Sequence, residues 1–159
     1  MKRNLLITLA ALAVVIVATP IANAQTKKTK LTADAAAIPT QQALYNDFRG
    51  VRLGMAAEEV RTKLGNPVLK DDEMDYFVFS ESLTAQIAYD QAHKTKAISV
   101  DYAGGVGAPD YRAIVGTDLQ NRADGSAYQM VRYPAQGFWV SYNRTAGPLF
   151  VVTITIQKM

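Results

Sequence analysis

The only histidine of the chain is His93, and histidine is the side chain best suited to act as a general base near neutral pH. A catalytic histidine needs a protected pocket with a nucleophile beside it. His93 instead lies in the polar stretch from Asp90 to Lys96, which predicts a solvated hairpin turn. A zinc site is excluded as well, because one histidine without any cysteine cannot supply the usual ligands.

The densest group of carboxylates is Asp71, Asp72, Glu73 and Asp75. Calcium loops use closely spaced oxygen ligands, but they also need a turn glycine and a fixed spacing that this run lacks. Paired carboxylates can hydrolyse glycosidic bonds, yet the flanking sequence gives no sign of a cleft. We therefore predict a solvated acidic loop, and for the whole chain no catalytic residue, no metal site and no cofactor.

Three glycines, Gly104, Gly105 and Gly107, are close together, as they are in a phosphate-binding loop. Such a loop joins a strand to a helix and carries a lysine, and this stretch lacks that context. A linker between two structural units is the interpretation that we favour.

The remaining candidate site is a set of polar side chains around Trp139, the only tryptophan. Tryptophan combines a large apolar area with a polar nitrogen and is enriched at the energetic centres of protein interfaces. The predicted partner-binding residues share one face of a sheet: Thr84, Gln86, Trp139, Ser141, Asn143, Thr153 and Thr155, with Ser99 beside them. Two alternatives stay open. The first is that a loop or residues 25–39 cover Trp139, and the second is that a one-residue shift in register places it in the core.

Six stretches with alternating apolar and polar residues are predicted to be strands: residues 76–80, 83–89, 97–102, 128–133, 138–144 and 149–157. Their alternation gives one apolar and one polar face, which is typical of an antiparallel sheet covered on one side. Four tyrosines are expected in the core: Tyr76, Tyr89, Tyr128 and Tyr142. A packed core around them favours protein binding, whereas a cavity lined by their hydroxyls favours a small ligand.

Three short helices are expected to lie against this sheet, over residues 40–48, 56–64 and 109–115. In the second, Glu58 and Glu59 favour the positive end of the helix dipole, and Gly65 with Pro67 ends the helix. Its charged side chains are predicted to form a solvated face: Glu58, Glu59, Arg61 and Lys63.

The N-terminus is typical of a secretory signal peptide over residues 1–24, followed by a flexible spacer over residues 25–39. Lys2 and Arg3 precede an apolar run of 14 residues, which is shorter than the ~20 that a membrane-spanning helix needs. Cleavage before Gln25 leaves 15 Lys and Arg against 14 Asp and Glu. This balance argues against nucleic acid as a partner. Without any cysteine, neither a thioether-linked lipid anchor nor a disulfide can form.

The two halves of the remaining chain can be aligned with an offset of 51 to 53 residues. The matched positions include Leu64 with Val115, Gly65 with Gly116, and Tyr89 with Tyr142. We therefore predict two helix-plus-sheet repeats, over residues 40–103 and 104–159. The expected fold class is α+β, a tandem repeat of short helices packed on one face of an antiparallel sheet.

The segment from Leu53 to Pro67 resembles a signature of the BamE (SmpA/OmlA) and β-lactamase-inhibitor-protein-like superfamily. The residues that carry the resemblance are Leu53, Gly54, Met55, Glu59, Val60, Leu64, Gly65 and Pro67. It implies short helices on an antiparallel sheet and a non-enzymatic envelope protein that binds other proteins. The chain departs from the BamE-type lipoproteins and from the disulfide-bonded inhibitors, because it has no cysteine.

These observations predict a periplasmic or secreted, non-enzymatic module that binds an envelope or secreted protein through its polar sheet face. The alternatives are a small-ligand carrier and an inhibitor of a secreted hydrolase.

Overall fold

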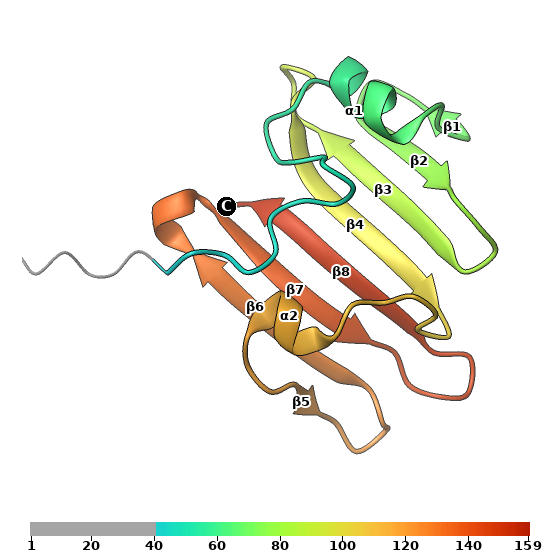
Figure 1. Ribbon diagram of the computed structural model, residues 1–159, viewed down its shortest axis with the longest axis vertical. Coiled ribbons are helices and arrows are strands. Elements are labelled where there is room, and N and C mark those ends of the chain that lie inside the picture. Colours follow the sequence, from blue (N-terminus) through green and yellow to red (C-terminus); the bar gives the residue numbers. More distant parts are fainter. Residues whose placement is uncertain (1–40) are drawn as a thin grey trace, which may run out of the picture. The chain divides into compact units, whose positions relative to one another are not determined.

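The computed structural model describes residues 41–159 of the chain (Figure 1). The predicted signal peptide (1–24) and spacer (25–39) lie outside these residues, as does Thr40 at the start of the first expected helix. Within the described part, no helix combines the length and the apolar character needed to cross a membrane.

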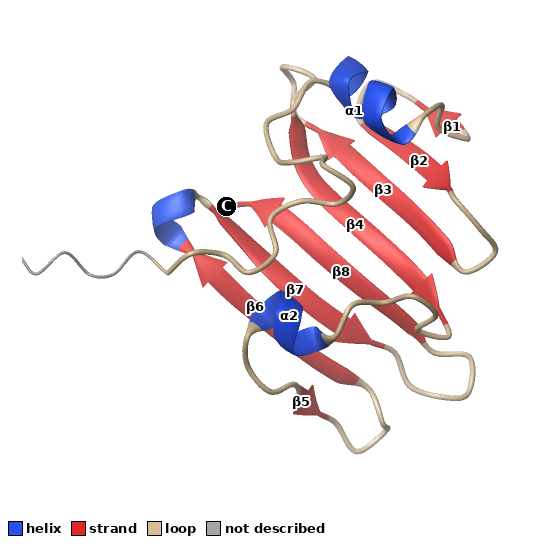
Figure 2. Ribbon diagram, in the orientation of Figure 1, coloured by secondary structure: helices blue, strands red, loops and turns tan. Residues whose placement is uncertain are grey.

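Strands dominate the described chain, and the helices are short (Figure 2). The strands are β1 (Leu69–Lys70), β2 (Met74–Val78), β3 (Leu83–Tyr89), β4 (Thr95–Ala103), β5 (Gln120–Asn121), β6 (Ala127–Tyr133), β7 (Phe138–Arg144) and β8 (Val151–Lys158). The helices are α1 (Ala57–Leu64), α2 (Tyr111–Val115) and the 3-10 helix η1 (Pro134–Gln136).

All eight strands belong to one antiparallel sheet with the order β1-β2-β3-β4-β8-β7-β6-β5. The last strand in the sequence therefore lies in the middle of the sheet, between β4 and β7. Ala97 of β4 pairs with Gln157 of β8, and Trp139 of β7 pairs with Gln157 on the other side.

The predicted fold class, an α+β tandem repeat of short helices packed on a sheet, is wrong. The described residues are mostly one eight-stranded antiparallel sheet, accompanied by two α-helices of only eight and five residues. The helical spacing of apolar residues predicts more helix than the described chain forms. The expected first helix shows why, because residues 41–48 are not helical. Leu44 and Phe48 have a helical spacing, but Phe48 instead begins a tight two-residue hairpin with Val51.

Alternation along the four central strands is as the sequence predicts. Every second side chain points into the core: Ala85, Ile87 and Tyr89 on β3, Ile98, Val100 and Tyr102 on β4, Phe138, Val140 and Tyr142 on β7, and Val152, Ile154 and Ile156 on β8. We call this side of the sheet the covered face. β-branched residues suit such strands because their branched side chains pack well on a pleated surface.

Strand β2 departs from the prediction by one residue. Asp75 and Phe77 lie in the core, with 0% and 1% of their surface exposed, whereas Tyr76 is only half-buried. Because neighbouring residues of a strand point to opposite faces, the expected burial of Tyr76 is wrong. Tyr128 is also half-buried, on the face opposite the core.

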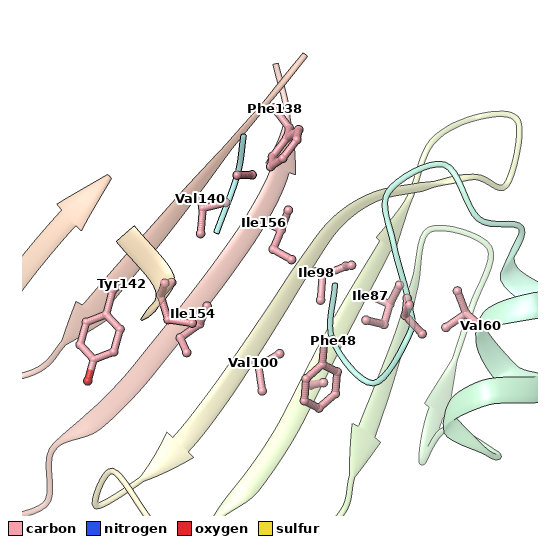
Figure 3. Close-up of a cluster of buried hydrophobic side chains, with 14 of the residues drawn as sticks. Phe48, Val60, Ile87, Ile98, Val100, Phe138, Val140, Tyr142, Ile154 and Ile156 are labelled. Carbon is pink, nitrogen blue, oxygen red and sulfur yellow. The ribbon is translucent and has the colours of Figure 1, made fainter. Parts of the chain in front are cut away.

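The covered face is closed by both α-helices and by the segment that leads into α1 (Figure 1). Figure 3 shows Phe48 and Val60, which come from outside the sheet, beside Ile87 and Ile98. Val60 of α1 and Ile114 of α2 have no more than 1% of their surface exposed. The two helices thus complete one hydrophobic core.

Candidate functional site

The sheet face opposite the core, which we call the open face, carries residues that alternate with the core residues. In register across the central strands, Gln86, Ser99, Thr155 and Ser141 form one row. Thr84, Asp101, Thr153 and Asn143 form the next row. Trp139 lies in the neighbouring row, opposite Gln157, so the seven predicted partner-binding residues lie together on one continuous surface.

Large side chains border this hydroxyl-rich centre. Trp139 stands between Gln157 and Arg132 in the register, and Tyr76 and Tyr128 lie toward the two edges of the sheet. Trp139 is half-buried, and its neighbours Phe138 and Val140 face the core. The alternative of a shifted register with Trp139 in the core is therefore wrong.

Exposure differs among the seven residues. Gln86 is exposed, and Thr84, Trp139, Asn143, Thr153 and Thr155 are half-buried. Ser141 is buried, with 6% of its surface exposed. A partner on this face would thus contact the other six residues before Ser141, which is buried between its neighbours.

Hydrogen bonds between strands hold the polar centre of the open face. The Thr153 hydroxyl donates to Asp101 Oδ1 over 2.6 Å, and the hydroxyls of Ser99 and Thr155 lie 3.3 Å apart. Asp101 is the one carboxylate of these two rows. Side chains that are fixed in this way lose little conformational entropy when a partner binds.

No family model, curated protein or solved structure matches the chain. The function therefore has to be argued from the geometry of the molecule. Within residues 41–159, no group of three or more histidine, cysteine, aspartate or glutamate side chains is placed to hold a metal ion.

One polar cluster was missed by the sequence analysis, and it joins α1 to the sheet. Arg61 donates from Nε to Asp75 Oδ2 over 2.8 Å and from Nη2 to Oδ1 over 3.0 Å. Tyr89 donates to Asp75 Oδ2 over 2.7 Å. Arg61 also donates from Nη1 to Glu58 over 2.6 Å. The prediction that Arg61 and Asp75 are solvated is wrong, since 14% and 0% of their side chains are exposed.

The chemistry of this cluster is that of a structural ion pair. Burial raises the pKa of Tyr89, and its hydrogen bond to Asp75 raises it further. The hydrogen bond to Asp75 is also the main cause that raises the pKa of Arg61. Tyr89 therefore stays protonated and Arg61 stays charged at neutral pH, which suits a fixed contact and not proton transfer.

His93, Asp71 and Asp72 line a hollow of about 580 Å³ beside the first turn of α1. His93, Asp71 and Asp72 are all exposed, as predicted. The backbone of His93 accepts a hydrogen bond from Ala57, so the turn that contains it supports the start of α1. The imidazole itself has no hydrogen-bonded partner among the described residues that would make it a catalytic base.

Proposed function

We propose that this chain is an exported, non-enzymatic module that binds a protein of the bacterial cell envelope through its open face. The observation that carries the proposal is the position of Trp139, half-buried and in register with Gln157 and Arg132 on a surface of hydroxyl and amide side chains. The predicted periplasmic or secreted location rests on the signal peptide, and the resemblance of residues 53–67 to the BamE superfamily stays a prediction.

The size of the open face supports a protein as the partner. Six strands about 4.8 Å apart, each with three residues on this face about 6.8 Å apart, cover roughly 600 Å² in projection. A stable interface buries about 800 Å² of accessible surface on each partner. Side-chain relief makes the accessible area larger than the projected area, so the two values are comparable.

The composition of the open face also supports a protein as the partner. Aromatic rings and methionines lie at the flanks of a polar centre. The two rows described above include only one carboxylate, Asp101. Protein interfaces are depleted in charge at their centre and enriched in tryptophan, tyrosine and methionine. An inhibitor of a secreted hydrolase would differ from this proposal only in its partner.

Two of the four tyrosines expected in the core argue against a carrier with its ligand deep in the molecule. Tyr89 donates its hydroxyl to Asp75, and the ring of Tyr142 packs edge-on against Tyr111 with centroids 6.2 Å apart. Tyr76 and Tyr128 lie on the open face, away from the core. The four hydroxyls therefore do not line a common cavity.

The test is affinity capture from envelope extract with residues 25–159 as bait. We expect a partner that is retained by the unchanged bait and lost with Trp139→Ala. Leu149→Ala is the matched control, because Leu149 is a large apolar side chain, 90% exposed, in the turn before β8. All three baits should show the same melting temperature.

A photo-reactive residue at Gln86 then locates the contact, with one at Thr62 on the exposed side of α1 for comparison. A crosslink from position 86 and none from position 62 supports the open face. If all baits capture the same proteins, or none, the proposed function is wrong.

A further inference from the structure

Arg144, at the end of β7, differs from Arg61, the other half-buried arginine of residues 41–159. Arg61 forms ion pairs with both Asp75 and Glu58. Arg144 is half-buried, and no carboxylate of the described chain lies within salt-bridge distance of it. A charge withdrawn from water without a counter-charge is unfavourable.

The hydrogen bonds of Arg144 are also incomplete. A guanidinium has five N–H donors, and the bond found for Arg144 within the described chain runs from Nη2 to the backbone oxygen of Gly125 over 2.9 Å. Its Nε atom is buried and has no acceptor among residues 41–159. Buried donors are almost always satisfied in folded proteins, so the Arg144 guanidinium is under-bonded within the described chain.

Arg144 lines an open hollow of about 420 Å³ on the covered face. The other lining residues are Tyr111, Asp118, Leu119, Asn121 and Tyr142. They come from α2, from the chain that follows it into β5, and from β7, and Figure 1 shows α2 over β6 and β7. The hollow is on the side of the sheet away from the open face.

The walls of the hollow combine aromatic surface with the guanidinium of Arg144, which has no carboxylate partner among the described residues. The rings of Tyr111 and Tyr142 meet at 65°, edge to face. Asp118 is the carboxylate of the lining, and it is already paired with Arg112 over 2.6 Å. Asp118 therefore does not compensate the charge of Arg144.

We propose that this hollow binds a small aromatic carboxylic acid, whose carboxylate contacts the Arg144 guanidinium and whose ring lies against Tyr111 and Tyr142. Planar carboxylates match the donor geometry of a guanidinium, as the two-pronged contact between Arg61 and Asp75 shows within this same protein. Tyrosine rings supply the flat apolar surface that an aromatic group prefers. The site does not depend on the proposed protein partner, because it lies on the other face of the sheet.

The experiment is an NMR titration of the protein with benzoate, following the side-chain Nε–H signal of Arg144. We expect a saturable shift with a Kd on the order of 1 mM, as suits a ligand of this size. Benzamide, which has the same shape without the charge, should produce no such shift. Acetate should bind at least about tenfold more weakly than benzoate, because it lacks the ring.

Two variants complete the test. Arg144→Met keeps the length of the side chain without its charge, and it should weaken benzoate binding by at least about tenfold. Arg122→Met, at an exposed arginine in the turn after β5, should leave binding unchanged. If Arg144→Met does not fold, the comparison of benzoate with benzamide on the unchanged protein decides. No saturable shift with benzoate, or an equal shift with benzamide, overturns the proposal.

Discussion

Asp75 of β2 links the sheet to α1. Its two carboxylate oxygens accept hydrogen bonds from Arg61 of α1 and from Tyr89 of β3. The substitution Asp75→Ala leaves Arg61 partly buried without its main counter-charge. We expect the free energy of unfolding to fall by about 3–5 kcal/mol, as is usual when one partner of a buried ion pair is removed. Urea unfolding followed by circular dichroism measures the change.

The control for this prediction is Asp72→Ala, three residues away on an exposed turn. It removes a carboxylate of the same acidic run without breaking a hydrogen bond of the described structure, so no measurable change is expected. Equal effects of the two substitutions would show that the buried cluster does not stabilise the protein.

The same residue shows where sequence reasoning failed at this scale. Asp75 belongs to a run of four acidic residues, and such runs are usually solvated. Its partner Arg61 is 14 positions away, on a helix whose charged residues also resemble a solvent-exposed face. Nothing local in the sequence marks the two as a pair, so the contact is visible only once α1 is placed beside β2.

Among the elements, the turn from β4 toward α2 offers a matched comparison of two glycines. Gly104 and Gly105 both have a positive φ, of 61° and 70°. A Cβ on Gly104 would meet nothing nearer than 3.9 Å, but a Cβ on Gly105 would lie 2.9 Å from Cε2 of Phe150. The glycines interpreted as a linker thus belong to a turn that packs against the approach to β8.

We therefore expect Gly104→Ala to lower the free energy of unfolding by about 1–2 kcal/mol, the cost of a left-handed backbone conformation. Gly105→Ala should cost about 1 kcal/mol more, because the Phe150 ring must move out of the way. Thermal and urea unfolding of the two variants give the difference. Equal losses would mean that the ring shifts freely.

Strand signals were more reliable than helix signals at the level of elements. The alternation in residues 83–89, 97–102 and 138–144 correctly predicts which side chains face the core, because a strand has only two faces. The expected helix over residues 40–48 rested on two apolar residues four apart, and an extended segment can present the same pair to the core. The two-residue strands β1 and β5 are too short to leave a pattern at all.

At the scale of the whole molecule, the position of β8 could not be read from the sequence. Alternating residues place Val152, Ile154 and Ile156 on one side of a strand, but they do not say which strands are its neighbours. The partners of β8 are β4, whose paired residues lie 48 to 60 positions earlier, and β7. The predicted partner-binding residues of the open face form one surface only because of this order.

We therefore expect that removal of residues 148–159 prevents the whole sheet from folding, instead of leaving a folded sheet with one strand fewer. The deletion takes away the strand that joins β4 to β7, together with three core side chains that are at most 2% exposed. We expect the shortened chain to show no cooperative unfolding transition by circular dichroism. Met159→Ala, which keeps the backbone hydrogen bond from Met159 to Gly137 and changes only an exposed side chain, should leave the melting temperature unchanged. A cooperative transition in the shortened chain would contradict this prediction.

The order of the strands also determines at which stage of its synthesis the protein can fold. The ribosome makes β8 last, and without it the two outer groups of strands share no hydrogen bonds in the middle of the sheet. Pairing between segments so distant in sequence is slow, because the loop entropy is lost before any contact is gained. A nascent chain with this topology cannot complete the sheet before β8 has been made. It can thus be threaded through a secretory channel before the sheet closes, as the export that we propose requires.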